Sequence, residues 1–276
     1  MILQNKNAVI YGAGGSLGSA VAKALAVAGA KVFLTGRTVS SLQKVADEIL
    51  AAGGRAEVEQ VDASDKKAIN DHLKKIVQQA GTVDISFNAT ASKVVQNIPL
   101  TDMSAEDFIS PITQMMHTRF LTAIAAGKVM MKQGSGVILS LTATPGGIGY
   151  PYTGGFAPAC CAIECFSGNL ASELGIYGVR VVNMRSAGSP DSKVFKQAID
   201  NHPQEMELVL RKMEADTMLK KLPLMEDIAN LAIFLSSSMA GKITGVTVDV
   251  TAGTTAGLNY RVKPIDSTRS AQTLAS

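Results

Sequence analysis

The feature that most limits the fold of this chain is a glycine-rich segment close to its N-terminus. It runs from Tyr11 to Gly18 (Tyr-Gly-Ala-Gly-Gly-Ser-Leu-Gly) and joins an apolar run, 7–11, to a helical pattern that opens at Ser16. Glycines let a backbone turn tightly, and the free N–H groups at a helix start attract an anion such as pyrophosphate. Strand, glycine turn and helix in this order predict the first βα unit of a nucleotide-binding sheet.

The rest of the chain repeats the same alternation. Further strand-like runs, short, apolar and β-branched, cover residues 31–35, 57–61, 83–87, 136–141, 179–184 and 246–250. Helical patterns cover residues 16–28, 40–52, a stretch between 61 and 83, 105–131, 156–174 and 225–235. Such alternation predicts an α/β fold, a Rossmann-type doubly wound parallel sheet with right-handed crossovers. With neither a repeat nor a linker, we expect a single domain over residues 1–260.

Two segments stand apart from this alternation. Residues 190–222 form a looser region with apolar side chains at Phe195, Met206, Leu208, Leu210, Met213, Met218 and Leu219. Flexible thioethers suit a lid over an irregular apolar ligand, but a helix pair whose apolar face is simply core would give the same pattern. The polar tail, 261–276, is expected to be disordered or to lie over a neighbouring subunit.

Composition excludes several classes of function. The 26 basic and 23 acidic residues are spread along the chain, so we expect neither a nucleic-acid nor a membrane partner. The sequence has no apolar run long enough for a spanning helix, and we expect no signal peptide. The clustered cysteines Cys160, Cys161 and Cys165 do not suggest a disulfide framework. These features predict a cytoplasmic protein with a small-molecule partner and without a metal site.

The end of the second strand-like run bears on the choice of nucleotide. Proteins that prefer NAD carry an acidic residue here, which accepts hydrogen bonds from the ribose 2′-hydroxyl. In this chain the run ends Gly36-Arg37, and a guanidinium matches the geometry of a 2′-phosphate. We therefore predict NADP(H), the alternative being an ordinary solvated arginine.

Taken together, these motifs make the chain resemble the short-chain dehydrogenase/reductase superfamily from about residue 5 to residue 260. The glycine turn resembles the family's T-G-x-x-x-G-x-G, Val61-Asp62-Ala63 its Asp-Val pair, and Phe87 to Thr90 its N-N-A-G. Ala187-Gly188 resembles the family's P-G loop. The resemblance implies these cofactor-binding residues: Gly12, Gly14, Gly15, Ser16, Leu17, Gly18, Arg37, Asp62, Ala63, Asn88, Ala89 and Gly188.

The resemblance also implies a catalytic Ser, Tyr and Lys with a supporting Asn, and this chain lacks them. Phe156 stands at the Tyr position, Cys160 at the Lys position, Ala143 at the Ser position and Met115 at the Asn position. A register slip does not restore the Lys, because the sequence has no lysine between Lys132 and Lys193. A free phenol has a pKa of about 10, so the family's Tyr needs that Lys to donate a proton at neutral pH. We predict that the usual proton relay is absent.

Several side chains are candidate substitutes, each with an ordinary alternative. Tyr150 and Tyr152 precede Phe156, where enoyl reductases of the superfamily place a donor Tyr, but they also suit surface packing. Thr142 (and Thr144 beside it) could hydrogen-bond a substrate oxygen or be a plain strand-end hydroxyl. His117 and Cys160 are weaker candidates, as a satisfied histidine and an inert buried thiol respectively.

Three functions remain open from the sequence. The first is an NADPH-dependent oxidoreductase that reduces a carbonyl or an activated double bond of a small apolar substrate with a non-standard proton donor. The second is an inactive nucleotide-binding regulator or scaffold, and the third is an isomerase or cyclase on the same fold. In each case we expect a homo-oligomer, a tetramer as in similar proteins. Helix 156–174 would provide the close contact through small residues: Ala157, Ala159, Ala162, Ser167, Gly168 and Ala171.

Overall fold

A parallel sheet runs through the centre of the molecule. The computed structural model describes residues 1–257, and within them seven parallel strands take the order β3-β2-β1-β4-β5-β6-β7. The strands are β1 (Asn7–Tyr11), β2 (Lys31–Gly36), β3 (Arg55–Gln60), β4 (Ile85–Asn88), β5 (Gly136–Ala143), β6 (Val179–Ser186) and β7 (Thr247–Val250). The order reverses between β1 and β4, the position at which open α/β sheets bind ligands. The predicted single-domain Rossmann-type fold is confirmed.

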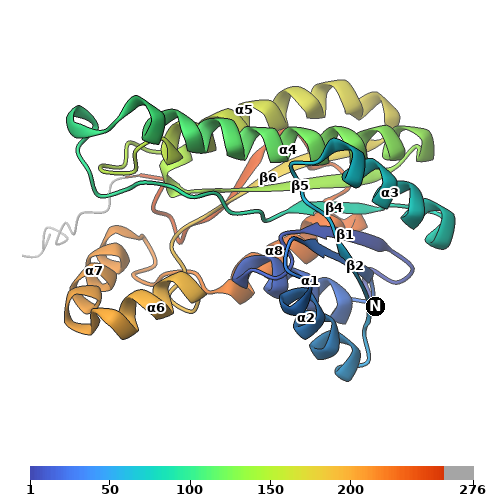
Figure 1. The fold of residues 1–276 in the computed structure, drawn as a ribbon, viewed down its shortest axis with the longest axis horizontal. Coiled ribbons are helices and arrows are strands. Elements are labelled where there is room, and N and C mark those ends of the chain that lie inside the picture. Colours follow the sequence, from blue (N-terminus) through green and yellow to red (C-terminus); the bar gives the residue numbers. More distant parts are fainter. Residues whose placement is uncertain (258–276) are drawn as a thin grey trace, which may run out of the picture.

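Helices cover both faces of the sheet (Figure 1). One face carries α1 (Ser16–Val27), α2 (Val39–Ala51) and α8 (Met225–Ser236), and the other carries α3 (Lys66–Ala80), α4 (Ala105–Gln133) and α5 (Phe156–Leu174). All five residues of β1 are buried: Ala8 and Ile10 pack into the first apolar layer, and Val9 and Tyr11 into the second. Alternate side chains of a strand point to opposite faces, so a strand covered on both sides is apolar throughout.

Local signals set the ends of the helices. Asp65 caps α3 by accepting from the backbone N–H groups of Lys67 and Ala68, and Ser104 caps α4 by accepting from Asp107 N. Helix α4 ends at Gly134 with a φ of 71°, a left-handed conformation that glycine adopts without strain. These caps satisfy backbone groups that each helix leaves without an internal partner.

The looser region of the sequence forms a helix pair at one end of the sheet. Helices α6 (Lys193–Asn201) and α7 (Pro203–Asp216) are both described in full, and neither contains a buried residue (Figure 1). Their apolar face is therefore not core. Phe195 and Met213 still close over the backbone of Gly188, where a Cβ atom would lie 2.6 Å and 2.7 Å from them.

Six of the seven strands differ from the predicted ranges by one or two residues at an end, and the pairing explains two of them. Strand β3 starts at Arg55 because it pairs in register with β2 from Lys31 onward, although its outward side chains are polar. Strand β4 covers Ile85–Asn88 and not 83–87, because it pairs with β1 from Ala8 to Tyr11. Among residues 1–257, no helix is long and apolar enough to cross a membrane. The predicted tail, 261–276, lies outside the described residues.

Candidate functional site

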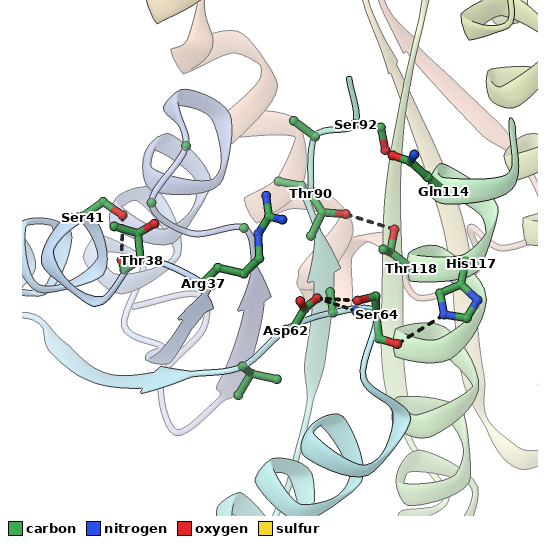
Figure 2. Close-up of a pocket in the computed structure, with 18 of the residues that line it drawn as sticks. Arg37, Thr38, Ser41, Asp62, Ser64, Thr90, Ser92, Gln114, His117 and Thr118 are labelled. Carbon is green, nitrogen blue, oxygen red and sulfur yellow. Dashed lines mark hydrogen bonds between the residues drawn. The ribbon is translucent and has the colours of Figure 1, made fainter. Parts of the chain in front are cut away.

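A cleft opens at the carboxyl ends of the strands, where the strand order reverses. Its first cavity, of about 620 Å³, is lined by seven of the predicted cofactor residues: Gly12, Gly14, Gly15, Arg37, Asp62, Ala63 and Ala89 (Figure 2). A second cavity, of about 360 Å³, lies beside it and includes Leu17. Both cavities are lined by Thr90, Ala91 and Ser92, so the two are neighbouring parts of this cleft.

The glycine turn is shaped by close backbone approach. Gly12 has a φ of 77°, and a Cβ atom there would lie 2.9 Å from the carbonyl carbon of Ala89. A Cβ atom on Gly18 would lie 2.3 Å from the carbonyl oxygen of Gly12. Helix α1 begins after Gly15 without a capping side chain from the described residues. The first N–H groups of α1 are therefore available to an anion, and the turn fits the pyrophosphate of a dinucleotide.

Two charged side chains, Arg37 and Asp62, line the first cavity. The exposed Arg37 extends into it from the end of β2 (Figure 2). Asp62 accepts hydrogen bonds from Ser64 N at 2.9 Å and from Ser64 Oγ at 2.7 Å. These two hydrogen bonds, and then the charge of Arg37, lower the pKa of Asp62, so its carboxylate is ionised at neutral pH.

Four predicted cofactor residues support the cleft without lining it: Ser16, Gly18, Asn88 and Gly188. Asn88 donates to Thr122 Oγ1 at 2.9 Å and accepts from Thr90 N at 2.9 Å, which ties β4 to α4. Ser16 Oγ accepts from Lys193 N at 3.0 Å, which joins the start of α6 to the glycine turn.

The second cavity contains the positions at which the family's catalytic residues were expected. Met115, Ala143 and Phe156 line it, and Cys160 is buried beneath them. Burial raises the pKa of Cys160 to about 11, so the thiol is neutral at pH 7. None of these four side chains can act as the acid or the cation of the usual relay.

The three candidate proton donors are not equally placed. Thr142 lines the second cavity, where its Oγ1 donates to Glu164 Oε1 at 2.7 Å and accepts from Asn183 Nδ2 at 2.7 Å. Tyr150 and Tyr152 are 40% and 56% exposed and line neither cavity. The structure therefore brings Thr142 to the cleft and does not bring the two tyrosines there.

The remaining sequence candidates have ordinary surroundings. His117 lines the first cavity, with its Nε2 3.2 Å from Ser64 O, and so lies away from Phe156. The Thr144 hydroxyl donates to Ser186 O at 3.3 Å. Across residues 1–257, no group of three or more His, Cys, Asp or Glu side chains could hold a metal ion.

An ion-pair network lies behind Thr142. Arg185 on β6 donates to both carboxylate oxygens of Glu164 on α5, and its Nη1 lies 2.8 Å from Asp249 Oδ1 on β7. The hydrogen bond that Arg185 donates to Glu164 is the main cause that raises the pKa of Arg185. This network fixes the acceptor of the Thr142 hydroxyl, so the proton of that hydroxyl is already engaged.

The sequence analysis missed one charged residue of the second cavity. Arg119 lies one helical turn after Met115 on α4, is 5% exposed and lines the second cavity. Its Nη1 donates to Thr90 Oγ1 at 3.0 Å, whereas its Nε has no hydrogen-bond partner in the described part of the chain. The available signal was the spacing, since residues four apart on a helix share a face.

The chain is similar to known oxidoreductases over most of its length. A family model described as enoyl-(acyl carrier protein) reductase matches residues 12–255. An uncharacterized oxidoreductase of Thermotoga maritima is 31% identical over 93% of this chain and 100% of its own length. The 3-oxoacyl-[acyl-carrier-protein] reductase FabG of Escherichia coli is 28% identical over 92% of this chain and 98% of its own.

Solved structures show the same fold. A short-chain type dehydrogenase/reductase from Mycobacterium marinum has a TM-score of 0.79 and 26% identity, covering 92% of this chain and 97% of its own. The NAD⁺-bound structure of a xylitol dehydrogenase has a TM-score of 0.84 and 20% identity, covering 92% of this chain and all of its own. At that identity the second likeness concerns the fold alone.

Proposed function

The chain belongs to the short-chain dehydrogenase/reductase superfamily of oxidoreductases, and on that premise we propose that it is an NADP(H)-dependent reductase. Its substrate would be a small apolar molecule with a carbonyl group or an activated double bond, reduced with a non-standard proton donor. One observation carries the proposal: the glycine turn and Arg37 line the same cavity, at the reversal of strand order.

The residues of the cleft have the chemistry that such a cofactor needs. The first N–H groups of α1 would hold the pyrophosphate, Arg37 the 2′-phosphate, and Asp62 with Ala63 the adenine end. When bound, the nicotinamide supplies the hydride. The chain itself provides orientation, and the second cavity, next to the first, would exclude water from the reacting groups.

The names of the relatives support both kinds of acceptor. The matching family model is described as an enoyl reductase, and the FabG relative as a 3-oxoacyl reductase. The second cavity of this chain favours the activated acceptor. Phe156 and Ala143 carry no proton to donate, the buried Cys160 thiol is a very weak acid at neutral pH, and none of the three carries a positive charge. A conjugated double bond depends less on the usual relay than a plain ketone does.

We propose that the proton donor is one of the three hydroxyl side chains near the second cavity or in the loop before α5. Thr142 is the candidate that lines the cavity, but its hydroxyl proton is held by Glu164. Tyr150 or Tyr152 would have to move inward from the surface. We therefore expect Thr142→Val to lower turnover and Tyr150→Phe and Tyr152→Phe to leave it unchanged. Retained turnover in Thr142→Val, with loss in one tyrosine variant, would reverse the assignment.

The test of the cofactor assignment is a calorimetric titration with NADPH and NADH. Wild type should bind NADPH more tightly. Arg37→Ala should weaken NADPH about tenfold and leave NADH nearly unchanged, because one exposed charge-assisted pair to a phosphate is lost. Arg37→Lys is the matched control, since it keeps the charge without the bidentate fork. Equal loss of both nucleotides in Arg37→Ala would contradict the NADP(H) preference.

The test of turnover is a screen of ketones and conjugated enones with the preferred nucleotide. Oxidation of NADPH by at least one acceptor would support the reductase. Tight NADPH binding without reduction of any acceptor would instead favour a nucleotide-binding regulator or scaffold.

We also propose that the chain forms a homo-oligomer, a tetramer, in the cytoplasm. Three of the small residues expected at the contact, Ala159, Ser167 and Ala171, are buried within the chain, so they cannot provide it. The outer face of α4 and α5 instead carries the half-exposed Phe120, whose ring lies 5.8 Å from that of Phe166. Phe120→Glu should dissociate the oligomer in sedimentation at micromolar concentration, and a wild-type monomer there would overturn the proposal.

A further inference from the structure

The second cavity contains one charge without a counter-ion. Arg119 is the only charged side chain among the described residues that line it. It takes part in no ion pair within residues 1–257, and its one strong hydrogen bond goes to the neutral hydroxyl of Thr90. Cys160, whose charge would act on Arg119, is a neutral thiol because burial raises its pKa to about 11. The chain therefore leaves this guanidinium positive and uncompensated.

A buried guanidinium is normally paired. Moving a charge out of water is costly, and proteins offset that cost with an opposite charge and a complete set of hydrogen bonds. Arg119 is 5% exposed, and its Nε has no partner among residues 1–257. Burial lowers the pKa of Arg119 to about 10, so it stays protonated at neutral pH. An anion brought by a ligand would provide the missing partner.

A second unpaired group lines the same cavity. Ser189 is 3% exposed, and its Oγ has no hydrogen-bond partner in the described chain. It comes from the segment after β6, whereas Arg119 comes from α4, so two separate elements each bring a residue with an unsatisfied buried polar atom to the lining of one cavity. Five side-chain atoms of this kind occur among residues 1–257, and two of them belong to residues that line this cavity, which favours a polar ligand there.

We propose that the second cavity binds a small apolar carboxylate, with Arg119 as its counter-ion and Ser189 as an additional hydrogen-bond donor. This inference rests on the proposed function, because it names the substrate class of the same cleft. The remaining lining is largely apolar, with Val94, Met115, Phe156, Val194, Met225 and Ile228. A single cation suits a single negative charge, and the planar guanidinium matches a carboxylate in two parallel hydrogen bonds.

The test measures binding in the absence of turnover. Benzoate and hexanoate are titrated by calorimetry against the wild-type protein, beside their neutral analogues benzamide and hexanamide. Wild type should bind each carboxylate at least tenfold more tightly than its amide. Arg119→Met should remove that preference, and Arg119→Lys should keep part of it, because the charge remains and the fork is lost. Ser189→Ala should modestly weaken the binding of both carboxylates, benzoate and hexanoate.

Two controls separate this site from the nucleotide site and from a purely structural role. Arg37→Ala should leave benzoate affinity unchanged while it weakens NADPH. Thermal unfolding should show Arg119→Met at least as stable as wild type, since an apolar side chain replaces an unpaired buried charge. Should that variant fail to fold, the stabilisation of wild type by benzoate and not by benzamide still decides the question.

The failure of this inference and the failure of the proposed function have different signatures. Equal binding of benzoate and benzamide by wild type, or a benzoate preference that survives in Arg119→Met, would overturn the carboxylate site alone. Loss of NADPH binding, with benzoate selectivity intact, would overturn only the cofactor assignment.

Discussion

The two cavities of the cleft differ in how their polar groups are satisfied. In the first cavity, Asp62 and His117 both contact Ser64, and the glycine turn offers backbone N–H groups in a fixed arrangement. In the second cavity, the lining is mostly apolar, and Arg119 and Ser189 each keep an unpaired polar atom. The first is built mainly from backbone geometry and the second from side chains.

This difference bears on which residues of the cleft can vary. Gly12 and Gly18 are held by close backbone contacts, so replacement disturbs the fold as well as the proposed ligand site. Phe156 and Cys160 occupy their places in a helix without strain, and Cys160 joins a small apolar cluster. The proposed nucleotide binding and the proposed catalysis therefore depend on different residues of this cleft, and separate substitutions can test each.

The largest expected effect concerns the acceptor. Cyclohexanone should be reduced at least about 100-fold more slowly than cyclohex-2-enone, because general acid catalysis is worth about 10²–10⁴-fold and Phe156 cannot supply it. The measurement is kcat/KM from NADPH oxidation, with a blank lacking acceptor as control. Brisk reduction of cyclohexanone would show that the second cavity retains a proton relay, and the contrast between the cavities would fail.

The reactivity of the cysteines gives the next largest effect. Cys160 should react with iodoacetamide at pH 8 at least about 100-fold more slowly than Cys161 and Cys165, because only the thiolate attacks. Burial raises the pKa of Cys160 to about 11, so its thiolate forms only as the pH rises well above neutrality. Mass spectrometry would count the labelled sites, and Cys161→Ser with Cys165→Ser should abolish fast labelling. Rapid labelling of Cys160 would contradict its description as an inert part of the cavity floor.

A substitution in the glycine turn should have a smaller but measurable effect. Gly18→Ala places a Cβ atom 2.3 Å from the carbonyl oxygen of Gly12, so the turn must shift. We expect about 1–3 kcal/mol less free energy of unfolding, as for other overpacked sites, and at least tenfold weaker NADPH binding. Gly175→Ala is the matched control, because a Cβ atom there meets nothing within 4 Å. Equal effects of the two substitutions would mean that the turn is not held by close packing.

The smallest expected change is in the pH dependence of benzoate binding, where we expect none near neutral pH. Benzoate affinity should stay flat between about pH 6 and pH 8, since carboxylates ionise at about pH 4. Over the same range Arg119 remains charged, because burial lowers its pKa only to about 10. An ordinary histidine partner would lose its charge as the pH rises through about 6.5, and affinity would fall. Calorimetry at three pH values would separate the two, and a fall of several-fold above pH 7 would argue against Arg119.

Local patterns predicted the fold and the nucleotide end of the cleft. Apolar runs and helical periods identified the strands and the six helices that cover the sheet, within a few residues at each end. Seven of the expected cofactor residues line the first cavity, because a glycine turn and a strand end are set by chain neighbours. The helix pair α6 and α7 was less clear, since the same apolar pattern suits a lid or a core.

The sequence by itself determined what backbone conformation dictates: the alternation of strands and helices and the turn at Gly12 to Gly18. It also led to the expectation that Phe156 and Cys160 stand where the family has a relay. Only the tertiary structure decided which side chains share a space. Arg119 on α4 and Ser189 after β6 are 70 positions apart in the chain, yet both line one cavity, and neither finds a partner among the described residues. The spacing of residues in the sequence identifies neighbours within one helix or strand. Whether a buried charge has a partner depends on the side chains that all the surrounding elements bring near it, so only the tertiary structure shows it.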